Sequence, residues 1–302
     1  MRFSVALPTA YEGLGYPVGM VRDPSSLHRL ARTAERLGFD GLWANDHLVT
    51  PAFLRGESPH FYEAMVTLAS VASVTQRVRL GTAVLALLLR EPVLLARQAA
   101  TLAALSGGRF VLGLGLGAYP EELAETRPEA VGRPRAELFA ETLAALRAHL
   151  GDARIPIYVG GHGTAAVTRA AREGDGWMPG WQPFDVLTER IDLLRRELAA
   201  HGRDARAFAI APELSATIAP RHEDAVRRYE SSRFVRHRLT SDTTGRDQSL
   251  MTASNLVGSP DVIREKIARL EALGVDECAS LAFPAESIDD LEDQWAMFVE
   301  LL

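Results

Sequence analysis

The chain has 302 residues, of which 47% are hydrophobic and 24% charged, with a formal net charge of −6. This length suits one large α/β domain, and the charge gives no reason to expect nucleic acid or an anionic membrane as a partner. Cys278 is the only cysteine, the longest apolar run (83–89) is too short to span a bilayer, and the N-terminus is unlike a signal peptide, so we expect a cytoplasmic protein without intrachain disulfides.

Short apolar segments alternate with longer amphipathic ones, which is typical of repeated βα units. Eight strands are predicted, at residues 3–7, 39–44, 78–84, 110–115, 155–159, 176–178, 208–218 and 277–283. Eight such units predict a closed TIM (β/α)₈ barrel in a single domain over residues 1–302, rather than an open doubly wound sheet. In these barrels the functional residues lie in the loops after the strands.

Helix signals separate the predicted strands. Gly38 is placed to end the first helix as a C-cap. The last crossover helix is expected to begin with Ser259 as its cap and Pro260 in its first turn, and to stop at Gly274.

Residues 221–256, before the last strand, are longer and more polar than a βα connection requires. We interpret them as an inserted helix and loop that could cover the barrel mouth. Within them, residues 227–238 carry five arginines against one acid, Glu230. A solvated helix face is the simpler interpretation, and a basic surface for an anionic ligand is the alternative.

The second predicted strand is followed by Asp46 and His47. An acid and an imidazole at a barrel mouth can hydrogen-bond the edge of a heterocycle or move a proton near neutral pH. Both are candidate catalytic residues. The alternative is a loop cap at Asp46 beside a surface histidine.

The fourth predicted strand ends with Gly113, Gly115 and Gly117. Glycines at a spacing of two fall on one face of a strand and leave that face without side chains. This favours room for a flat ring or its side chain against the backbone; a tapering barrel interior would require the same glycines. The segment is not a Rossmann fingerprint, because it does not open directly into a helix after G-x-G-x-x-G.

The fifth predicted strand leads into Gly160, Gly161, His162, Gly163 and Thr164, followed by an alanine-rich helix. Backbone N–H groups at a helix start form a seat for phosphate, to which the Thr164 hydroxyl can add a donor. The alternative is an ordinary glycine turn with Thr164 as N-cap. Motifs for ATP-binding P-loops, zinc proteases and serine hydrolases do not occur, and we expect no metal site.

Taken in order, several segments resemble the bacterial-luciferase-like monooxygenase superfamily, in particular its branch of coenzyme F420-dependent oxidoreductases. The matching segments are residues 38–43 with Asp46 and His47, 79–84, 105–110 with the glycine-rich strand end, 155–163, 174–177 and 257–260. They cover nearly the whole chain outside the 221–256 insertion.

The resemblance implies a homodimer of TIM barrels with the ring of a deazaflavin or flavin in the barrel mouth. It implies a non-prolyl cis peptide between Ala83 and Val84, behind that ring. It further implies that the Asp46–His47 pair contacts the ring, that residues 160–164 bind phosphate, and that Trp177 belongs to the coenzyme site.

Two departures from the family pattern stand out. Relatives that act on sugar phosphates place an acid directly after the glycine-rich strand, where this chain has Ala118, so the proton donor is not identified. The region from Tyr119 to Gly151 is also short for this branch.

The leading hypothesis is hydride transfer between coenzyme F420 and a small organic substrate. The first alternative is an FMN-dependent monooxygenase of the same superfamily. A non-catalytic protein that binds flavin or deazaflavin is another, and a phosphosugar isomerase or aldolase on the same barrel would suit the phosphate loop but not the glycine-rich strand end.

Overall fold

A computed structural model describes residues 1–50, 54, 59–117, 119–240 and 247–302 of the chain. Ala118 and residues 241–246 of the predicted insertion lie outside the described residues.

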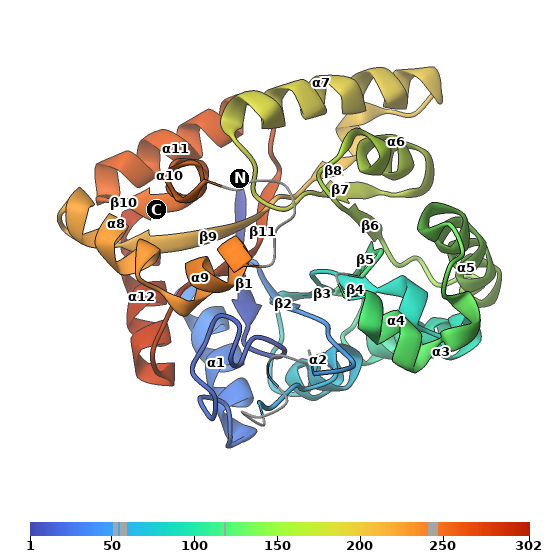
Figure 1. The fold of residues 1–302 in the computed structure, drawn as a ribbon, viewed down its shortest axis with the longest axis horizontal. Coiled ribbons are helices and arrows are strands. Elements are labelled where there is room, and N and C mark those ends of the chain that lie inside the picture. Colours follow the sequence, from blue (N-terminus) through green and yellow to red (C-terminus); the bar gives the residue numbers. More distant parts are fainter. Residues whose placement is uncertain (51–53, 55–58, 118, 241–246) are drawn as a thin grey trace.

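Parallel strands form the centre of the molecule (Figure 1). Neighbouring strands pair in the order β1 (Arg2–Leu7), β2 (Gly41–Ala44), β3 (Arg79–Thr82), β5 (Phe110–Gly115), β6 (Ile157–Gly160) and β7 (Gly176–Met178). On the other side of β1 lies β11 (Glu277–Ala282). The predicted TIM-barrel architecture is confirmed.

A single stretch of chain joins the two ends of this sheet. Its first part, β8 (Ala209–Ile210), pairs with β7, and its second part, β9 (Glu213–Ile218), pairs with β11. The predicted strand 208–218 is therefore interrupted between these two parts. A short strand that the sequence did not predict, β10 (Leu256–Gly258), pairs with the far end of β9.

The predicted strand 78–84 also divides. Strand β3 ends at Thr82, the Ala83–Val84 peptide bond is cis, and β4 (Leu85–Ala86) then pairs with β5. The cis bond implied by the family resemblance is thus confirmed.

Helices cover the outside of the barrel (Figure 1). They are α1 (Ser25–Leu37), α2 (Ala64–Ala72), α3 (Pro92–Leu105), α4 (Pro120–Thr126), α5 (Arg135–Leu150), α6 (Thr164–Glu173), α7 (Phe184–Ala200), α11 (Pro260–Ala272) and α12 (Ile288–Leu301), with 3₁₀ turns η2 (Leu87–Leu89), η3 (Pro128–Ala130) and η4 (Ala205–Ala207). Gly38 ends α1 with φ 95°, as predicted. Ser259 precedes α11, but its side chain makes no capping hydrogen bond.

The predicted insertion contains more helix than expected. Instead of one helix and a loop, the described part holds α8 (His222–Glu230), α9 (Arg233–Thr240) and α10 (Gln248–Ser254). Helices α8 and α10 contact each other and β10, beside the strand that closes the barrel.

Two large aromatic side chains fill the barrel interior, where Trp43 and Tyr158 stack with ring centroids 6.1 Å apart. Glycines make room for them. A β-carbon at Gly81 would collide with the Trp43 ring, and one at Gly176 would lie 2.6 Å from the Tyr158 ring. The interior is therefore a packed core, and the site has to lie above it, at one end of the strands.

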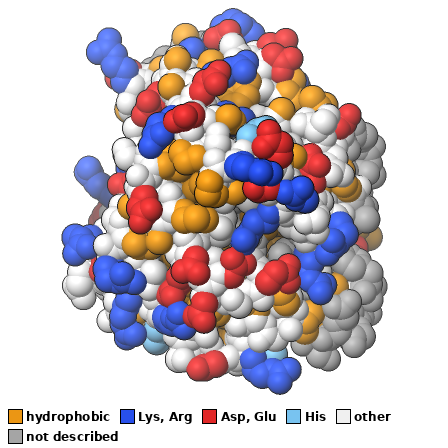
Figure 2. Space-filling view, turned by 90° about the vertical axis from the view of Figure 1, so that its left-hand side faces the viewer, with side chains coloured by type: hydrophobic (Ala, Val, Ile, Leu, Met, Phe, Trp, Pro, Cys, Tyr) orange, Lys and Arg blue, Asp and Glu red, His pale blue; other side chains and the backbone are white. Residues whose placement is uncertain are grey.

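The face on the left of Figure 1 mixes basic, acidic and apolar side chains, without a broad area of one charge (Figure 2). Ion pairs tie α12 to its neighbours: Arg228 of α8 pairs with Asp290, and Arg29 of α1 pairs with Asp289 and Glu292. Among the helices that the structure describes, none is long and apolar enough to cross a membrane.

Candidate functional site

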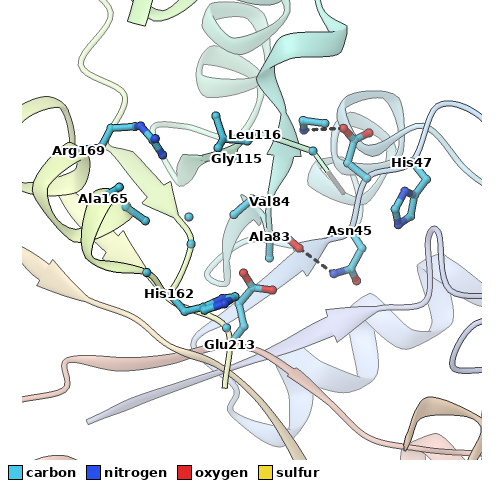
Figure 3. Close-up of a pocket in the computed structure, with 18 of the residues that line it drawn as sticks. Asn45, His47, Ala83, Val84, Gly115, Leu116, His162, Ala165, Arg169 and Glu213 are labelled. Carbon is cyan, nitrogen blue, oxygen red and sulfur yellow. Dashed lines mark hydrogen bonds between the residues drawn. The ribbon is translucent and has the colours of Figure 1, made fainter. Parts of the chain in front are cut away.

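A cavity of about 540 Å³ opens at the carboxyl ends of the barrel strands (Figure 3). Its volume lies within the range of small-molecule and cofactor sites. It is lined by Tyr11, Asn45, Asp46, His47, Ala83, Val84, Ala86, Gly115, Leu116, Gly117, Gly160, Gly161, His162, Gly163, Ala165, Ala166, Arg169, Gly180, Glu213 and Arg238. Most of the predicted site residues therefore meet in one place. Gly113, Thr164 and Trp177 do not line the cavity.

Asp46 lies at the cavity with its carboxylate turned into the protein. One oxygen accepts from the Ala86 amide at 2.9 Å and the other from Arg90 Nη2 at 2.6 Å, and the side chain is fully buried. Burial raises the pKa of the Asp46 carboxyl, against the effects of Arg90 and the Ala86 amide. Because both oxygens are engaged, this geometry favours a positioning role over the predicted catalytic one.

His47 is better placed for proton chemistry. Its Nδ1 lies 3.2 Å from Oε2 of Glu122, a buried carboxylate that also accepts from the Leu48 amide at 3.0 Å. The imidazole packs at a tilt against Tyr119, with centroids 5.1 Å apart. This carboxylate–imidazole pair can orient the ring and hold or pass a proton. Glu122 was not recognised from the sequence.

Asn45 connects the loop after β2 to the cis peptide. Its Nδ2 donates to the Ala83 carbonyl at 2.8 Å, and its backbone N–H donates to Thr9 Oγ1 at 3.0 Å. Within the described residues, the buried Asn45 Oδ1 has no hydrogen-bond partner. An acceptor left unsatisfied beside a cavity is suited to a ligand that supplies an N–H or O–H group.

The glycine-rich end of β5 does not leave an empty face, which corrects the expectation from the sequence. A β-carbon at Gly113 would collide with the Thr82 carbonyl, and one at Gly115 would lie 2.5 Å from Val84 Cγ2. At Gly117 the nearest atom would be the Ala86 β-carbon, at 3.3 Å. These glycines accommodate the β3–β4 segment, and the ligand space lies beyond Val84.

The loop after β6 carries backbone donors beside the cavity, which Gly163 and Ala165 line. Gly163 is the N-cap of α6, no side chain caps the helix, and Thr164 is exposed as its first residue. In the described part of the chain, the amides of Gly163, Thr164 and Ala165 have no acceptor. Three N–H groups without an acceptor, beside the positive end of the helix dipole, are suited to bind an anion, and we call these residues the anion seat.

Arg169 adds a positive charge to this seat. It lies on α6, lines the same cavity, and stacks over the Phe139 ring at 5.2 Å. Among the described residues its guanidinium makes neither a hydrogen bond nor an ion pair. Arg169 was not predicted from the sequence; the available signal was its place four residues after Ala165, on the same helix face.

Trp177 supports the seat from behind. Its side chain is fully buried, and its Nε1 donates to the Gly161 carbonyl at 2.7 Å. Gly161 itself has φ 116°, and a β-carbon there would lie 2.8 Å from that of Ala166. The loop therefore requires glycine at this position.

The opposite wall carries a carboxyl that sequence reasoning also missed. Glu213 begins β9, and burial raises the pKa of its side chain to about 7, against the opposing charge of Arg238. Arg238 comes from α9, where burial also lowers the pKa of His237 to about 4. His237 Nε2 lies 3.3 Å from the Tyr119 hydroxyl, so α9 covers one side of the mouth.

Within the described part of the chain, no group of three or more histidine, cysteine, aspartate or glutamate side chains is placed to hold a metal ion. The polar groups at the cavity are backbone amides with a guanidinium at one end, and the Asn45 acceptor with His47 at the other. They fit an elongated organic anion with a polar ring edge (Figure 3).

Comparison with known proteins gives two sequence relationships. The model of the luciferase-like monooxygenase family matches residues 1–277. The F420-dependent glucose-6-phosphate dehydrogenase of Kineococcus radiotolerans is 31% identical over 239 residues, which are 70% of this chain and 68% of that protein.

Solved structures share the fold. A monooxygenase from Streptomyces bottropensis matches with a TM-score of 0.80 at 22% identity, over 100% of this chain and 98% of that one. The coenzyme F420-dependent tetrahydromethanopterin reductase of Methanopyrus kandleri matches with a TM-score of 0.74 at 18% identity, over 100% and 98%. An FMN-bound Baeyer–Villiger monooxygenase component from Pseudomonas putida matches with a TM-score of 0.73 at 18% identity, over 100% and 96%. At these identities the likeness concerns the fold alone.

Proposed function

Because this chain belongs to the luciferase-like monooxygenase family, whose model matches residues 1–277, we propose that it is an oxidoreductase that transfers a hydride between coenzyme F420 and a small organic substrate. The observation that carries the proposal is the anion seat at Gly163–Ala165 and Arg169, which shares one cavity with the polar groups of Asn45 and His47. Figure 3 places Val84 between these two ends.

The residues present fit such a coenzyme. The free amides at the start of α6 and the Arg169 guanidinium would hold its phosphate. The unsatisfied Asn45 Oδ1 would accept a hydrogen bond from the ring edge, and Val84 would support the ring. When bound, the coenzyme supplies the hydride chemistry, and the protein supplies binding and orientation.

His47 and Glu122 are proposed to hold a proton at the ring side of the cavity. Glu122 fixes the imidazole through Nδ1, so Nε2 is the atom left to exchange a proton. Asp46 has a positioning role, because its hydrogen bonds to Ala86 and Arg90 hold the loop that carries His47 against the β4 segment.

F420 is preferred over FMN because the relative at 31% identity is named for F420 and because of the Asp46–His47 pair. An FMN-dependent monooxygenase stays the alternative, because the family is described as monooxygenases and a solved structure of the same fold holds FMN. Fluorescence titration of the purified protein with each coenzyme tests the assignment. Saturation by F420 at micromolar or lower concentration supports it, and a response to FMN alone would favour the alternative.

The homodimer implied by the resemblance stays a prediction. Val66 of α2 and Val93 and Leu94 of α3 are exposed apolar side chains on adjacent helices, which is consistent with a covered surface. Light scattering after size exclusion would report the mass in solution, with twice the chain mass expected.

A further inference from the structure

We propose that Glu213 is a further catalytic residue, which exchanges a proton with the oxygen of an alcohol or carbonyl substrate on the wall opposite the β4 segment. The inference rests on the proposed function, because the hydride partner is the coenzyme. It adds the substrate class and the group that handles the substrate proton.

The backbone of Glu213 is fixed by the barrel. Its amide donates to the Pro179 carbonyl at 2.8 Å, and the residue forms an isolated parallel bridge with Gly180 just beyond β7. Glu213 and Gly180 both line the cavity. In Figure 3 the Glu213 carboxylate points from its strand toward the Ala83–Val84 segment, into the space left for a ligand.

Glu213 differs from the acids buried near the barrel ends, because each of those is bonded to another described residue. Asp46 is paired with Arg90, Glu122 accepts from two amides, Glu277 is paired with Arg79, and Glu12 accepts from three amides. Within the described residues, no hydrogen bond or ion pair reaches the Glu213 side chain. Glu213 is half-buried, and its carboxylate borders the cavity instead of being used by the fold, so it is available to a ligand there.

Among the described residues, charged and titratable groups that share the cavity with Glu213 come from several elements. Arg238 reaches the cavity from α9, Tyr11 from the loop after β1, and His162 from the loop after β6. Arg238 lowers the pKa of Glu213, but burial outweighs it and raises the value to about 7. Both protonation states are therefore available near neutral pH, which suits a general acid and base.

The reaction balances with Glu213 as the proton carrier. In the oxidative direction the alcohol O–H proton passes to the Glu213 carboxylate, while the carbinol C–H bond breaks and its electron pair leaves as hydride to the oxidised deazaflavin. The carbon–oxygen double bond forms. In the reductive direction the protonated Glu213 returns the proton to the carbonyl oxygen as the carbon receives the hydride.

The first test needs no coenzyme. Infrared difference spectroscopy of the purified full chain, titrated between about pH 5 and pH 9, follows the carbonyl stretch of protonated carboxyl groups. A carboxyl that titrates near pH 7 is expected in the wild type and in Glu230→Gln, and is expected to be lost in Glu213→Gln. Glu230 is the matched control because it is a partly buried glutamate outside the cavity, bonded to Thr252. An unchanged titration in Glu213→Gln would overturn the proposal.

The second test uses oxidised F420 and a panel of primary and secondary alcohols, with coenzyme reduction as the readout. Glu213→Gln should bind F420 within about twofold of the wild type, since its side chain lies apart from the anion seat, and should lose at least about 10²-fold in turnover. Glu213→Asp should recover part of that loss.

Wild-type turnover by Glu213→Gln, or F420 binding by the wild type with no alcohol oxidised, would contradict the proposal. Failure of the wild type to bind F420 would instead refute the proposed function, and the infrared titration would still decide whether Glu213 titrates near neutrality.

Discussion

Val84 occupies the space that Gly115 leaves open on the neighbouring strand: a β-carbon at Gly115 would lie 2.5 Å from Val84 Cγ2. A β-carbon at Gly160, on the next strand, would lie 2.9 Å from Val84 Cγ1. The Val84 side chain is thus set between two glycines, and it forms part of the cavity lining. The position of this wall depends on glycine at both places.

Gly115→Ala should therefore destabilise the protein by about 1–3 kcal/mol, because the added methyl group overlaps Val84 in a packed region. Val84→Ala should remove most of that penalty when the two changes are combined. Urea denaturation of the two single variants and the double variant measures the coupling. Gly180→Ala is the control, because a β-carbon there has no atom within 4 Å. If the effects of the two changes on the free energy of unfolding are additive, the side chains at positions 115 and 84 do not contact each other.

Arg169→Met should weaken F420 binding by about 10- to 100-fold, because it removes a charge-assisted contact to phosphate and keeps most of the side-chain length. Binding of a deazaflavin that lacks the phosphate tail should not change. Arg172→Met on the same helix is the control, since Arg172 is paired with Glu173 and does not line the cavity. Equal loss for both ligands would argue against an anion seat at Arg169.

Glu122→Ala should lower the free energy of unfolding by about 1–3 kcal/mol, because the Leu48 amide and the His47 ring lose their acceptor. Chemical denaturation measures this loss. Glu121→Ala, one residue earlier in the first turn of α4, should change stability far less. If the two variants are equally stable, Glu122 does not hold the loop after β2.

Stability should depend on pH through Glu213. The pKa of an unfolded glutamate is about 4.3, whereas burial raises that of Glu213 to about 7. When the pKa of a group is higher in the folded state, its protonated form stabilises the fold. This contribution to the free energy of unfolding is complete below the pKa of the unfolded state and is lost as pH rises through the pKa of the folded state. In thermal unfolding, the melting temperature of Glu213→Gln should therefore rise relative to that of the wild type as pH increases from about 4.3 to about 7. A difference in melting temperature that stays constant over this range would contradict the raised pKa.

The sequence predicted the barrel because each βα unit carries a local signal, such as the apolar run before Gly115 or Gly38 after the first helix. It also located the loops after β2 and β6. It did not predict the interruption between β8 and β9, because the break is set by pairing with two different neighbours, although Pro212 and Glu213 mark its place in the sequence.

The functional groups that the sequence missed depend on tertiary contacts. Glu122 and Glu213 are ordinary glutamates in the sequence, and only the folded chain brings them to His47 and into the cavity. The glycines of β5 were interpreted as space for a ring because a strand pattern does not show which side chain lies opposite. The structure places Val84 there.

The central claim is that this cavity binds the phosphate-bearing deazaflavin F420, and equilibrium fluorescence titration tests it most directly. Purified protein is titrated with F420 and, separately, with FMN at the same pH and salt concentration. We predict a dissociation constant for F420 that is micromolar or lower, and weaker binding of FMN. Saturation by FMN with no response to F420 would contradict the claim and would favour an FMN-dependent monooxygenase.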